Sequence, residues 1–382
     1  MNEWKTVRLG DVATYINGYA FKPSDWTNEG LPIIRIQNLT GNDYETNYFN
    51  GELPEKYYIK NGDVLISWSA SLGVYEWKKS DALLNQHIFK VVFNKLDVDK
   101  KYFMFTVSNL LNAMTKQTHG STMRHITKPD FDNMEFPLPP LAEQKHIAAI
   151  LDKTQKIIAE HKQMLQKYDT LIKSRFIEMF GDPVTNTMAW EVRKLNELFE
   201  IIDGDRGKNY PKADELFDTE GYCLFLNAGN VTKTGFVFDN CQFITKEKDE
   251  ILRKGKLKRK DIIVTTRGTV GNIAEYSDNI TFKNMRINSG MVILRKIKEM
   301  NSTFFIYYFR NPAIYGRLIS GTAQPQMPIN NMKNCNVIVP PLTLQNDFAA
   351  FVQQIDKSKF AVQKSLKKTE TLYKSLMQQY FA

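Results

Sequence analysis

A long polar helix pattern follows the stretch Pro137-Leu-Pro-Pro-Leu-Ala-Glu-Gln-Lys145, and a second one follows Pro340-Pro-Leu342. Proline is tolerated just before a helix but not inside one, so each Pro-Pro pair marks a helix start. Apolar or semi-apolar residues then recur at alternating steps of four and three. In the first helix they are Ile147, Leu151, Thr154, Ile158, His161, Leu165, Tyr168, Ile172, Phe176 and Met179. In the second they are Phe348, Phe351, Ile355, Ser358, Val362, Leu366, Thr369, Tyr373, Leu376 and Tyr380. This heptad spacing is typical of helices that pair along one face.

The segments upstream of the two helices resemble each other. Trp4-Lys-Thr-Val-Arg-Leu9 is echoed by Trp190-Glu-Val-Arg-Lys-Leu195, and Gly62-Asp-Val-Leu-Ile66 by Lys260-Asp-Ile-Ile-Val264. Between and beyond these stretches, Gly18 matches Gly204, Gly73 matches Gly271 and Asn85 matches Asn288. The chain is therefore one unit built twice. We predict domains at 1–140 and 183–340, each followed by a helix, at 141–182 and 341–382.

Each copy contains short runs rich in β-branched and aromatic residues, bounded by Gly, Asn and Asp. The runs are Ile33–Ile36, Val64–Ile66, Ile88–Phe93, Leu224–Leu226, Ile262–Val264 and Met291–Leu294. Short helices are expected near Lys101–Leu111 and Thr303–Arg310. The predicted fold class is α+β, with two tandem β-rich domains.

The two long helices are expected to pair with each other. Each seam covers only one face, and each helix should be roughly 54 Å long for about 36 residues. Because the copies follow head to tail through Gly181-Asp-Pro183, an approximate twofold axis would make the helices an antiparallel coiled coil. The alternative is that each helix packs back on its own domain. We interpret Thr154, His161, Ser358 and Thr369 as residues that fix the register.

Composition points to a globular protein outside the membrane. The chain has 382 residues, 42% of them hydrophobic and 24% charged, and a net charge of +9. No apolar run approaches the length of a membrane span, and the opening residues lack the order of a secretory signal. The three cysteines fit a reducing cytoplasm better than a disulfide framework. A cytoplasmic location is therefore expected.

Positive charge is densest in Arg253-Lys-Gly-Lys-Leu-Lys-Arg-Lys260. Such a cluster attracts polyanions, so it could contact phosphates, but it could equally be a solvated turn before a strand.

The familiar signatures of catalysis are missing. The sequence contains neither GxGxxG nor a Walker A motif, and its five histidines show no metal spacing. Asn311-Pro-Ala-Ile lacks the second proline and the aromatic residue of an amino-methyltransferase loop. We therefore expect no catalytic residue, cofactor site or metal site in this chain. An active site assembled from distant residues is the alternative.

The tandem design resembles the specificity subunits of type I restriction-modification systems over essentially the full length. Pro137–Lys145 resembles that family's boundary into its central conserved helix, and Trp190–Leu195 resembles its domain opening. Asp261-Ile-Ile-Val-Thr-Thr-Arg-Gly-Thr-Val-Gly271 resembles its strand and glycine turn. Ser320-Gly-Thr-Ala-Gln-Pro-Gln-Met327 resembles its loop before the last strand.

The resemblance implies a function and a set of partners. Each half would be a target recognition domain that reads one half of a split double-stranded DNA sequence. The coiled coil would act as spacer and as dock for two methyltransferase subunits, which translocating restriction subunits would join for cleavage. Those partners would bind S-adenosylmethionine, ATP and Mg²⁺.

The first copy departs from the family pattern in two loops. His119-Gly-Ser-Thr-Met-Arg-His125 replaces the Gly-Thr-Ala-Gln-Pro-Gln loop, and Ser67-Trp-Ser-Ala-Ser-Leu-Gly73 replaces the Arg-Gly turn. Because the halves would read different half-sites, we expect an asymmetric target.

Candidate DNA contacts are the side chains of Gly-bearing loops that can pair with base edges. In the first half they are Asn17, Tyr19, Lys22, Trp68, Ser69, Thr122 and Arg124, with packing the favoured role for Trp68. In the second half they are Arg206, Lys208, Asn209, Arg267, Gln324 and Gln326. The alternative for each is an ordinary surface-loop residue. For the whole chain, the alternatives are a coiled-coil assembly protein and a stand-alone enzyme.

Overall fold

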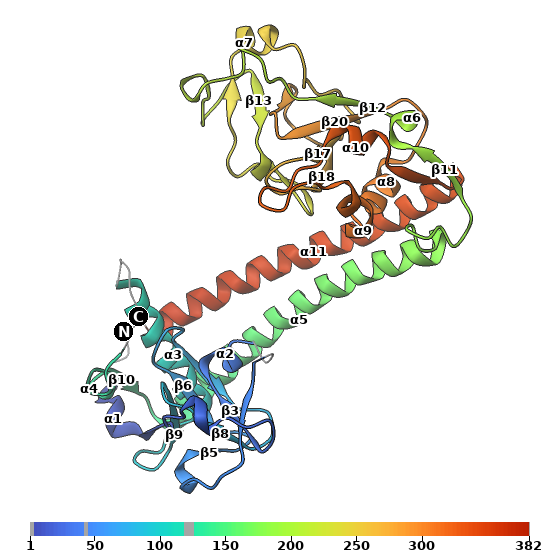
Figure 1. Cartoon of the computed structure of the whole chain (residues 1–382). Helices are drawn as coiled ribbons and strands as arrows, with labels where there is room; N and C mark the ends of the chain where they lie inside the picture. The colour runs from blue at the N-terminus through green and yellow to red at the C-terminus, as the bar shows by residue number, and fades with distance from the viewer. Residues whose placement is uncertain (1–3, 42–44, 118–125, 382) are drawn as a thin grey trace. The chain divides into compact units, whose positions relative to one another are not determined.

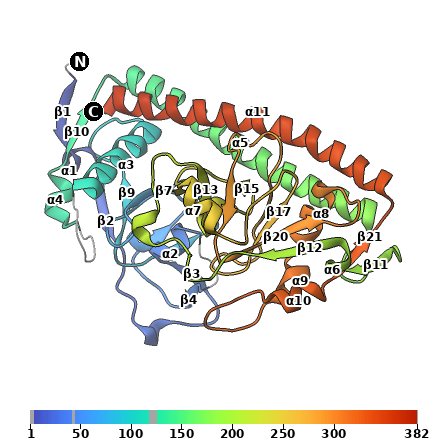
Figure 2. The same ribbon diagram turned by 90° about the horizontal axis from the view of Figure 1, so that it is seen from above.

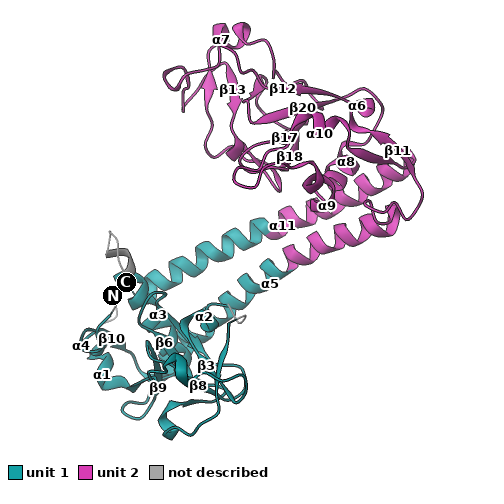
Figure 3. Cartoon of the chain, viewed as in Figure 1, with its two compact units in different colours: residues 1–163, 363–382 teal, residues 164–362 magenta. Residues whose placement is uncertain are grey.

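The computed structural model of the chain describes residues 4–41, 45–117 and 126–381. It divides into two compact units, residues 1–163 with 363–382 and residues 164–362 (Figure 3). Each unit therefore contains one β-rich domain and part of both long helices, α5 (Leu141–Phe180) and α11 (Leu342–Phe381).

The strands of unit 1 form two four-stranded sheets and one two-stranded pair. The sheet orders are β2-β9-β6-β7 and β4-β3-β8-β5, and the pair is β1-β10. The strands are β1 (Lys5–Arg8), β2 (Thr14–Asn17), β3 (Leu31–Ile34), β4 (Asn47–Phe49), β5 (Tyr58–Ile59), β6 (Val64–Ser67), β7 (Gly73–Glu76), β8 (Ala82–Leu84), β9 (Ile88–Val92) and β10 (Glu135–Leu138). The helices besides α5 are α1 (Leu9–Val12), α2 (Ile36–Leu39), α3 (Lys100–Gln117) and α4 (Lys128–Asp132), with 3₁₀ turns η1 (Pro23–Asp25) and η2 (Glu55–Tyr57).

Unit 2 has a similar plan, but its second sheet has three strands and it contains one more two-stranded pair (Figure 1). Its sheets have the orders β12-β20-β17-β18 and β16-β13-β19, with pairs β11-β21 and β14-β15. The strands are β11 (Glu191–Lys194), β12 (Phe199–Asp203), β13 (Cys223–Leu226), β14 (Val231–Thr232), β15 (Gly235–Phe236), β16 (Phe243–Ile244), β17 (Ile262–Thr265), β18 (Ile273–Glu275), β19 (Met285–Ile287), β20 (Met291–Lys296) and β21 (Asn336–Val339). The helices besides α11 are α6 (Leu195–Leu198), α7 (Lys246–Ile251), α8 (Ser302–Phe309), α9 (Pro312–Tyr315) and α10 (Ile329–Lys333), with 3₁₀ turns η3 (Ala213–Glu215), η4 (Ala228–Asn230) and η5 (Gly316–Leu318).

A buried glutamine explains why each Pro-Pro-Leu sequence starts a helix in a fixed place. Gln144 is 1% exposed; its Nε2 donates to the Pro139 carbonyl (2.8 Å), and its Oε1 accepts from the Asp99 N–H (2.9 Å) next to α3. In unit 2, Gln345 bonds in the same way to Pro340 (2.8 Å) and to Asn301 (2.9 Å), the N-cap of α8. The same side chain thus ties the long helix to the domain that precedes it in both copies.

The long helices run antiparallel within each unit, as predicted, and lie side by side there in both views (Figures 1 and 2). In unit 1 the Gln155 amide donates to the Tyr373 hydroxyl (2.8 Å), and Lys162 pairs with Glu370 (3.2 Å). In unit 2 Lys359 pairs with Asp169 (2.7 Å). Along α5, successive residues contact residues of α11 with ever lower numbers, as expected for antiparallel helices.

Both helices also pack on the domain cores, so pairing and packing back occur together. In unit 1, Ile147 and Leu151 of α5 are fully buried against the domain, and Tyr380 of α11 packs on the same cluster. In unit 2, Phe176 of α5 packs against Phe348 of α11 with ring centroids 5.4 Å apart. The predicted fold class, two tandem β-rich domains with antiparallel helices, is confirmed. Each helix has 40 residues, slightly longer than the 36 expected.

Candidate nucleic-acid interface

Three segments of unit 2 meet at one end of the sheet β12-β20-β17-β18. They are the loop after β12, the turn between β17 and β18, and the loop between β19 and β20. The Thr266 N–H donates to the Gly290 carbonyl (2.8 Å), which joins the last two segments. The first is pressed against the third at Gly204, where an alanine Cβ would lie 2.2 Å from the Asn288 carbonyl oxygen. Only glycine permits this approach.

Unit 1 builds the same scaffold from different residues. An alanine Cβ at Gly18 would lie 2.0 Å from the Asn85 carbonyl oxygen, and the Trp68 N–H donates to the His87 carbonyl (3.3 Å). In the β6–β7 turn, Ala70 has φ 56°, and its counterpart Gly268 in the β17–β18 turn has φ 71°. The Gly18–Gly204 and Asn85–Asn288 matches seen in the sequence are thus matches in structure.

A fourth segment completes the arrangement in unit 2. The Met327 N–H donates to the Thr266 carbonyl (2.9 Å), while Gln326 forms an antiparallel bridge with Arg267. The Gln326 N–H and carbonyl also bond to Ser320 (3.0 and 2.8 Å), which closes the loop into a hairpin. In unit 1 the Ile126 N–H donates to the Trp68 carbonyl (3.2 Å) at the corresponding place. The predicted contacts Thr122 and Arg124 precede it and lie outside the described residues.

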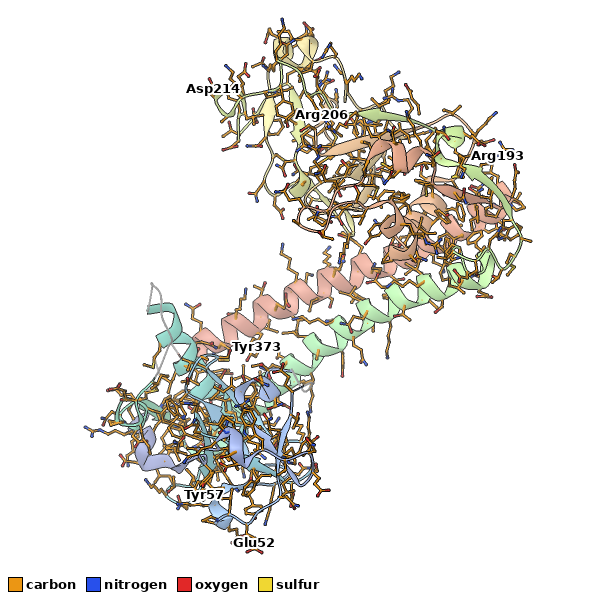
Figure 4. The ribbon with its side chains drawn as sticks, viewed as in Figure 1. Glu52, Tyr57, Arg193, Arg206, Asp214 and Tyr373 are labelled. Atoms are coloured by element: carbon orange, nitrogen blue, oxygen red, sulfur yellow. The ribbon has the colours of Figure 1, made fainter. Side chains whose placement is uncertain are left out.

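Three of the six contacts predicted in the second half come together. Arg206, Arg267 and Gln326 line one hollow of about 290 Å³ with Asp203 and Thr266. The Arg206 guanidinium donates to the Asp203 carboxylate (3.1 Å) and to the Ser289 carbonyl (3.3 Å), and these two bonds fix its position (Figure 4 labels Arg206). The exposed Arg267 has no ion pair or hydrogen bond from its guanidinium within the described part of the chain.

The other three predicted residues of unit 2 do not line this hollow. Lys208 and Gln324 are exposed, and Asn209 is half-buried. All three lie on the same loops as the residues that do line it.

Asp205, which the sequence analysis missed, orders the loop after β12. This 6% exposed carboxylate accepts hydrogen bonds from the N–H groups of Gly207 (3.0 Å) and Arg253 (2.8 Å). The Gly207 bond, together with the Arg253 N–H and guanidinium, lowers the pKa of Asp205 below its ordinary value despite burial. The sequence signal was its place between two glycines, where an Asp commonly bonds to backbone two residues on.

The predicted residues of unit 1 are placed more variously. Asn17 is exposed, and its amide oxygen accepts from the Trp68 indole N–H (3.3 Å). Trp68 stacks on Phe89 with centroids 5.6 Å apart, so it packs against the core, as favoured from the sequence. Ser69 is only 7% exposed.

The remaining two predicted residues of unit 1 lie farther along the loop after β2. Tyr19 is 37% exposed, and its ring meets the ring of Tyr57 edge to face at 5.5 Å (Figure 4 labels Tyr57). Lys22 is exposed and begins the turn η1. Unit 1 therefore presents aromatic and amide groups where unit 2 presents guanidinium groups.

Some residues of the basic cluster at 253–260 form hydrogen bonds and ion pairs within unit 2. The Arg259 guanidinium donates to the Ser277 carbonyl (2.7 Å) and lies 4.1 Å from the Tyr276 ring centroid. Lys256 and the buried Arg286 both bond to the Asp249 carboxylate. Burial raises the pKa of Asp249, but the bonds to the two cations have the larger effect, so the pKa lies below its ordinary value. Arg253, Lys254, Lys258 and Lys260 remain exposed.

Comparison with known proteins identifies the scaffold. The family model described as type I restriction modification DNA specificity domain matches residues 1–167 and 188–371, once for each copy. The chain belongs to this family.

Relatives of this specificity family match over nearly the whole chain. The type I restriction enzyme EcoBI specificity subunit of Escherichia coli is 23% identical, over 100% of this chain and 86% of its own length. The MjaVIII specificity subunit of Methanocaldococcus jannaschii is 24% identical, over 97% of this chain and 92% of its own. The crystal structure of a type I restriction-modification S subunit from M. genitalium has a TM-score of 0.62 at 17% identity and covers 100% of this chain and 97% of its own. That likeness shows the shared fold.

The described residues contain neither a candidate membrane-spanning helix nor a candidate metal site. Within the described ranges, no helix combines the length and the apolar content needed to cross a membrane. In the same ranges, no group of three or more His, Cys, Asp and Glu side chains could hold a metal ion.

Proposed function

We propose that this member of the specificity family reads a bipartite, asymmetric double-stranded DNA target and catalyses nothing itself. The observation that carries the proposal is the scaffold of glycine-pinned loops, which is built twice with different side chains. Gly18 and Gly204 bring these loops into close backbone contact with a neighbouring loop, which fixes the course of the loop backbone. Such preorganisation suits base reading, because discrimination depends on placing donors and acceptors opposite base edges.

The difference between the copies supports an asymmetric target. Arg267 occupies the turn position that Ser69 occupies in unit 1, and Thr266 corresponds to Trp68. An arginine pairs bidentately with guanine, whereas asparagine, here Asn17, pairs with adenine. The two half-sites should therefore differ in base sequence.

The partners in this proposal are two methyltransferase subunits and the translocating restriction subunits of a type I system. They would bring S-adenosylmethionine, ATP and Mg²⁺, and this chain would hold none of these. A second solved structure with a similar fold is described as showing complex assembly of the type I R-M system. It has a TM-score of 0.58 at 16% identity, and the match covers 100% of this chain and 98% of that chain. Large apolar side chains on the helices favour docking there, since Phe360 is 69% exposed and Leu372 53%.

Modification mapping tests this function. The chain is co-expressed with a type I methyltransferase subunit of the same organism, and N6-methyladenine is located by long-read sequencing of the host genome. A single split motif with a fixed gap is expected. A continuous motif would contradict two separate readers. No methylation, with the same methyltransferase active beside another specificity subunit, would favour the assembly-protein alternative.

A further inference from the structure

The hairpin β14–β15 of unit 2 has no assigned role, and its turn carries a lysine between two threonines. The Thr232 hydroxyl donates to the Gly235 carbonyl (2.9 Å) and accepts from the Thr234 N–H (3.3 Å). Gly235 has φ 127°, which suits a tight turn made with glycine. These bonds fix the turn and leave Lys233 exposed at its tip.

The hairpin is attached to the turn that carries Arg267. The Asn272 amide donates to the Val231 carbonyl (2.8 Å), linking the start of β14 to the β17–β18 turn. Between them lies a hollow of about 500 Å³ lined by Thr232, Lys233, Thr234, Thr269, Val270 and Asn272. Thr269 and Val270 follow Arg267 by two and three residues, so the hollow adjoins the candidate reading surface.

The lining matches the chemistry of a DNA strand. A nucleic-acid backbone alternates an apolar deoxyribose with an anionic phosphate, and lysine and threonine side chains are common phosphate partners. Threonine methyl groups and Val270 offer apolar surface, and Lys233 offers positive charge. Within the described residues Lys233 has no carboxylate partner, whereas Lys248 of the same unit pairs with Glu215 at 2.8 Å.

We propose that the hairpin is a phosphate clamp in which Lys233, presented on the turn that the Thr232 hydroxyl fixes, contacts a phosphate and holds the DNA backbone beside the base pair that Arg267 contacts. This inference rests on the proposed function for its ligand. It divides the surface into a part that positions the duplex and a part that reads it. The clamp should act on any DNA sequence, because a phosphate carries no base identity.

Salt-dependent binding to duplex DNA separates these roles. The full chain with its methyltransferase subunit is titrated with a duplex carrying the mapped motif and with a scrambled duplex, at several salt concentrations. Lys233→Gln should weaken both equally, by about eightfold at 0.1 M salt, and reduce the slope of log K against log salt by about 0.9, one phosphate's contribution. Lys233→Arg should restore the slope, since it keeps the charge.

Lys298→Gln is the matched control. Lys298 is also exposed in unit 2, but it follows β20 at the end of the sheet away from Arg267. It should leave affinity and slope unchanged. A Lys233→Gln variant that behaves like this control, or that weakens the motif duplex alone, overturns the clamp. Equal binding of both duplexes by the unsubstituted protein overturns sequence reading instead, and the slopes still decide the clamp.

Discussion

A single glycine in each unit, and one buried carboxylate in unit 2, fix the backbone of the loops. Gly18 and Gly204 allow one loop to touch the backbone of another, and Asp205 ties the loop after β12 to Arg253. Residues that touch no DNA in this proposal therefore set the positions of those that do.

Gly204→Ala should destabilise unit 2 by about 1–3 kcal/mol, the usual cost of forcing a methyl group into filled space. Its Cβ would lie 2.2 Å from the Asn288 carbonyl oxygen, and backbone there cannot move cheaply. Gly316→Ala is the control, because that residue has φ −59° and no neighbouring heavy atom within 4 Å of the added Cβ. Urea unfolding midpoints of the two variants check the prediction, and equal midpoints would contradict it.

Arg267→Gln should relax recognition at one guanine of one half-site. Loss of a bidentate arginine contact costs about 1–3 kcal/mol of discrimination against the wrong base. The other half-site should be unchanged, since unit 1 contributes its own loops. Modification mapping of the variant shows the outcome, and an unchanged motif would remove Arg267 from the reading residues.

Asp205 should make unit 2 sensitive to acid. Its folded pKa lies below the unfolded value of about 3.9, so its stabilising contribution is present above that value and is lost as pH falls through the folded pKa. Asp205→Asn should therefore lower the free energy of unfolding at pH 6 by about 1–3 kcal/mol and by less at pH 3.

Urea titrations at the two pH values measure this difference. Asp214→Asn, at an exposed carboxylate in the same unit (Figure 4), serves as control. A deficit for Asp205→Asn of the same size at both pH values would assign its effect to something other than ionisation.

Among the secondary-structure elements, α5 and α11 combine two kinds of surface. Seam residues such as Phe176 and Phe348 are buried in a core cluster. The hydroxyl of the buried Thr154 donates a hydrogen bond to the Ile150 carbonyl of the same helix (2.7 Å). Outside the seam, Ile177 is 50% exposed and Phe360 69%. One face of each helix thus supports the fold, while the other remains open to a partner.

Phe360→Ser should abolish or strongly reduce co-purification of the methyltransferase subunit without lowering the chain's stability. The ring is largely solvent-exposed, so its removal opens no cavity in the core. Lys357→Ser, another exposed substitution on α11, should have little effect. If the two variants retain the subunit equally, the docking face lies elsewhere.

For the chain taken as a whole, the continuous helices suggest a spacer. Each has 40 residues, or about 60 Å at 1.5 Å per residue. Inserting one heptad into both helices adds about 10.5 Å and preserves the seam. The gap between half-sites should lengthen while both half-sites stay the same. Modification mapping again provides the measurement, and an altered half-site would refute the spacer hypothesis.

The sequence by itself determined the architecture. Heptad spacing, the two Pro-Pro-Leu starts and the Gly18–Gly204 echo predict a duplicated β-rich unit with paired helices, because periodicity and backbone restrictions are local properties. Most predicted strands were found within a residue or two, although the run at Ile33–Ile36 ends as a strand at Ile34 and Ile36 begins α2. The two buried glutamines were not foreseen, since their partners at Asp99 and Asn301 are about 45 residues away.

The tertiary structure alone decided which loop residues share a surface. Arg206, Arg267 and Gln326 line one hollow, although up to 120 residues separate them in sequence, whereas Ser69 is buried by its neighbours. Nothing in the sequence pointed to Lys233 as a DNA contact, and only the structure places its hairpin beside the turn that carries Arg267. Exposure and proximity depend on long-range packing of side chains, and composition or spacing along the chain cannot specify them.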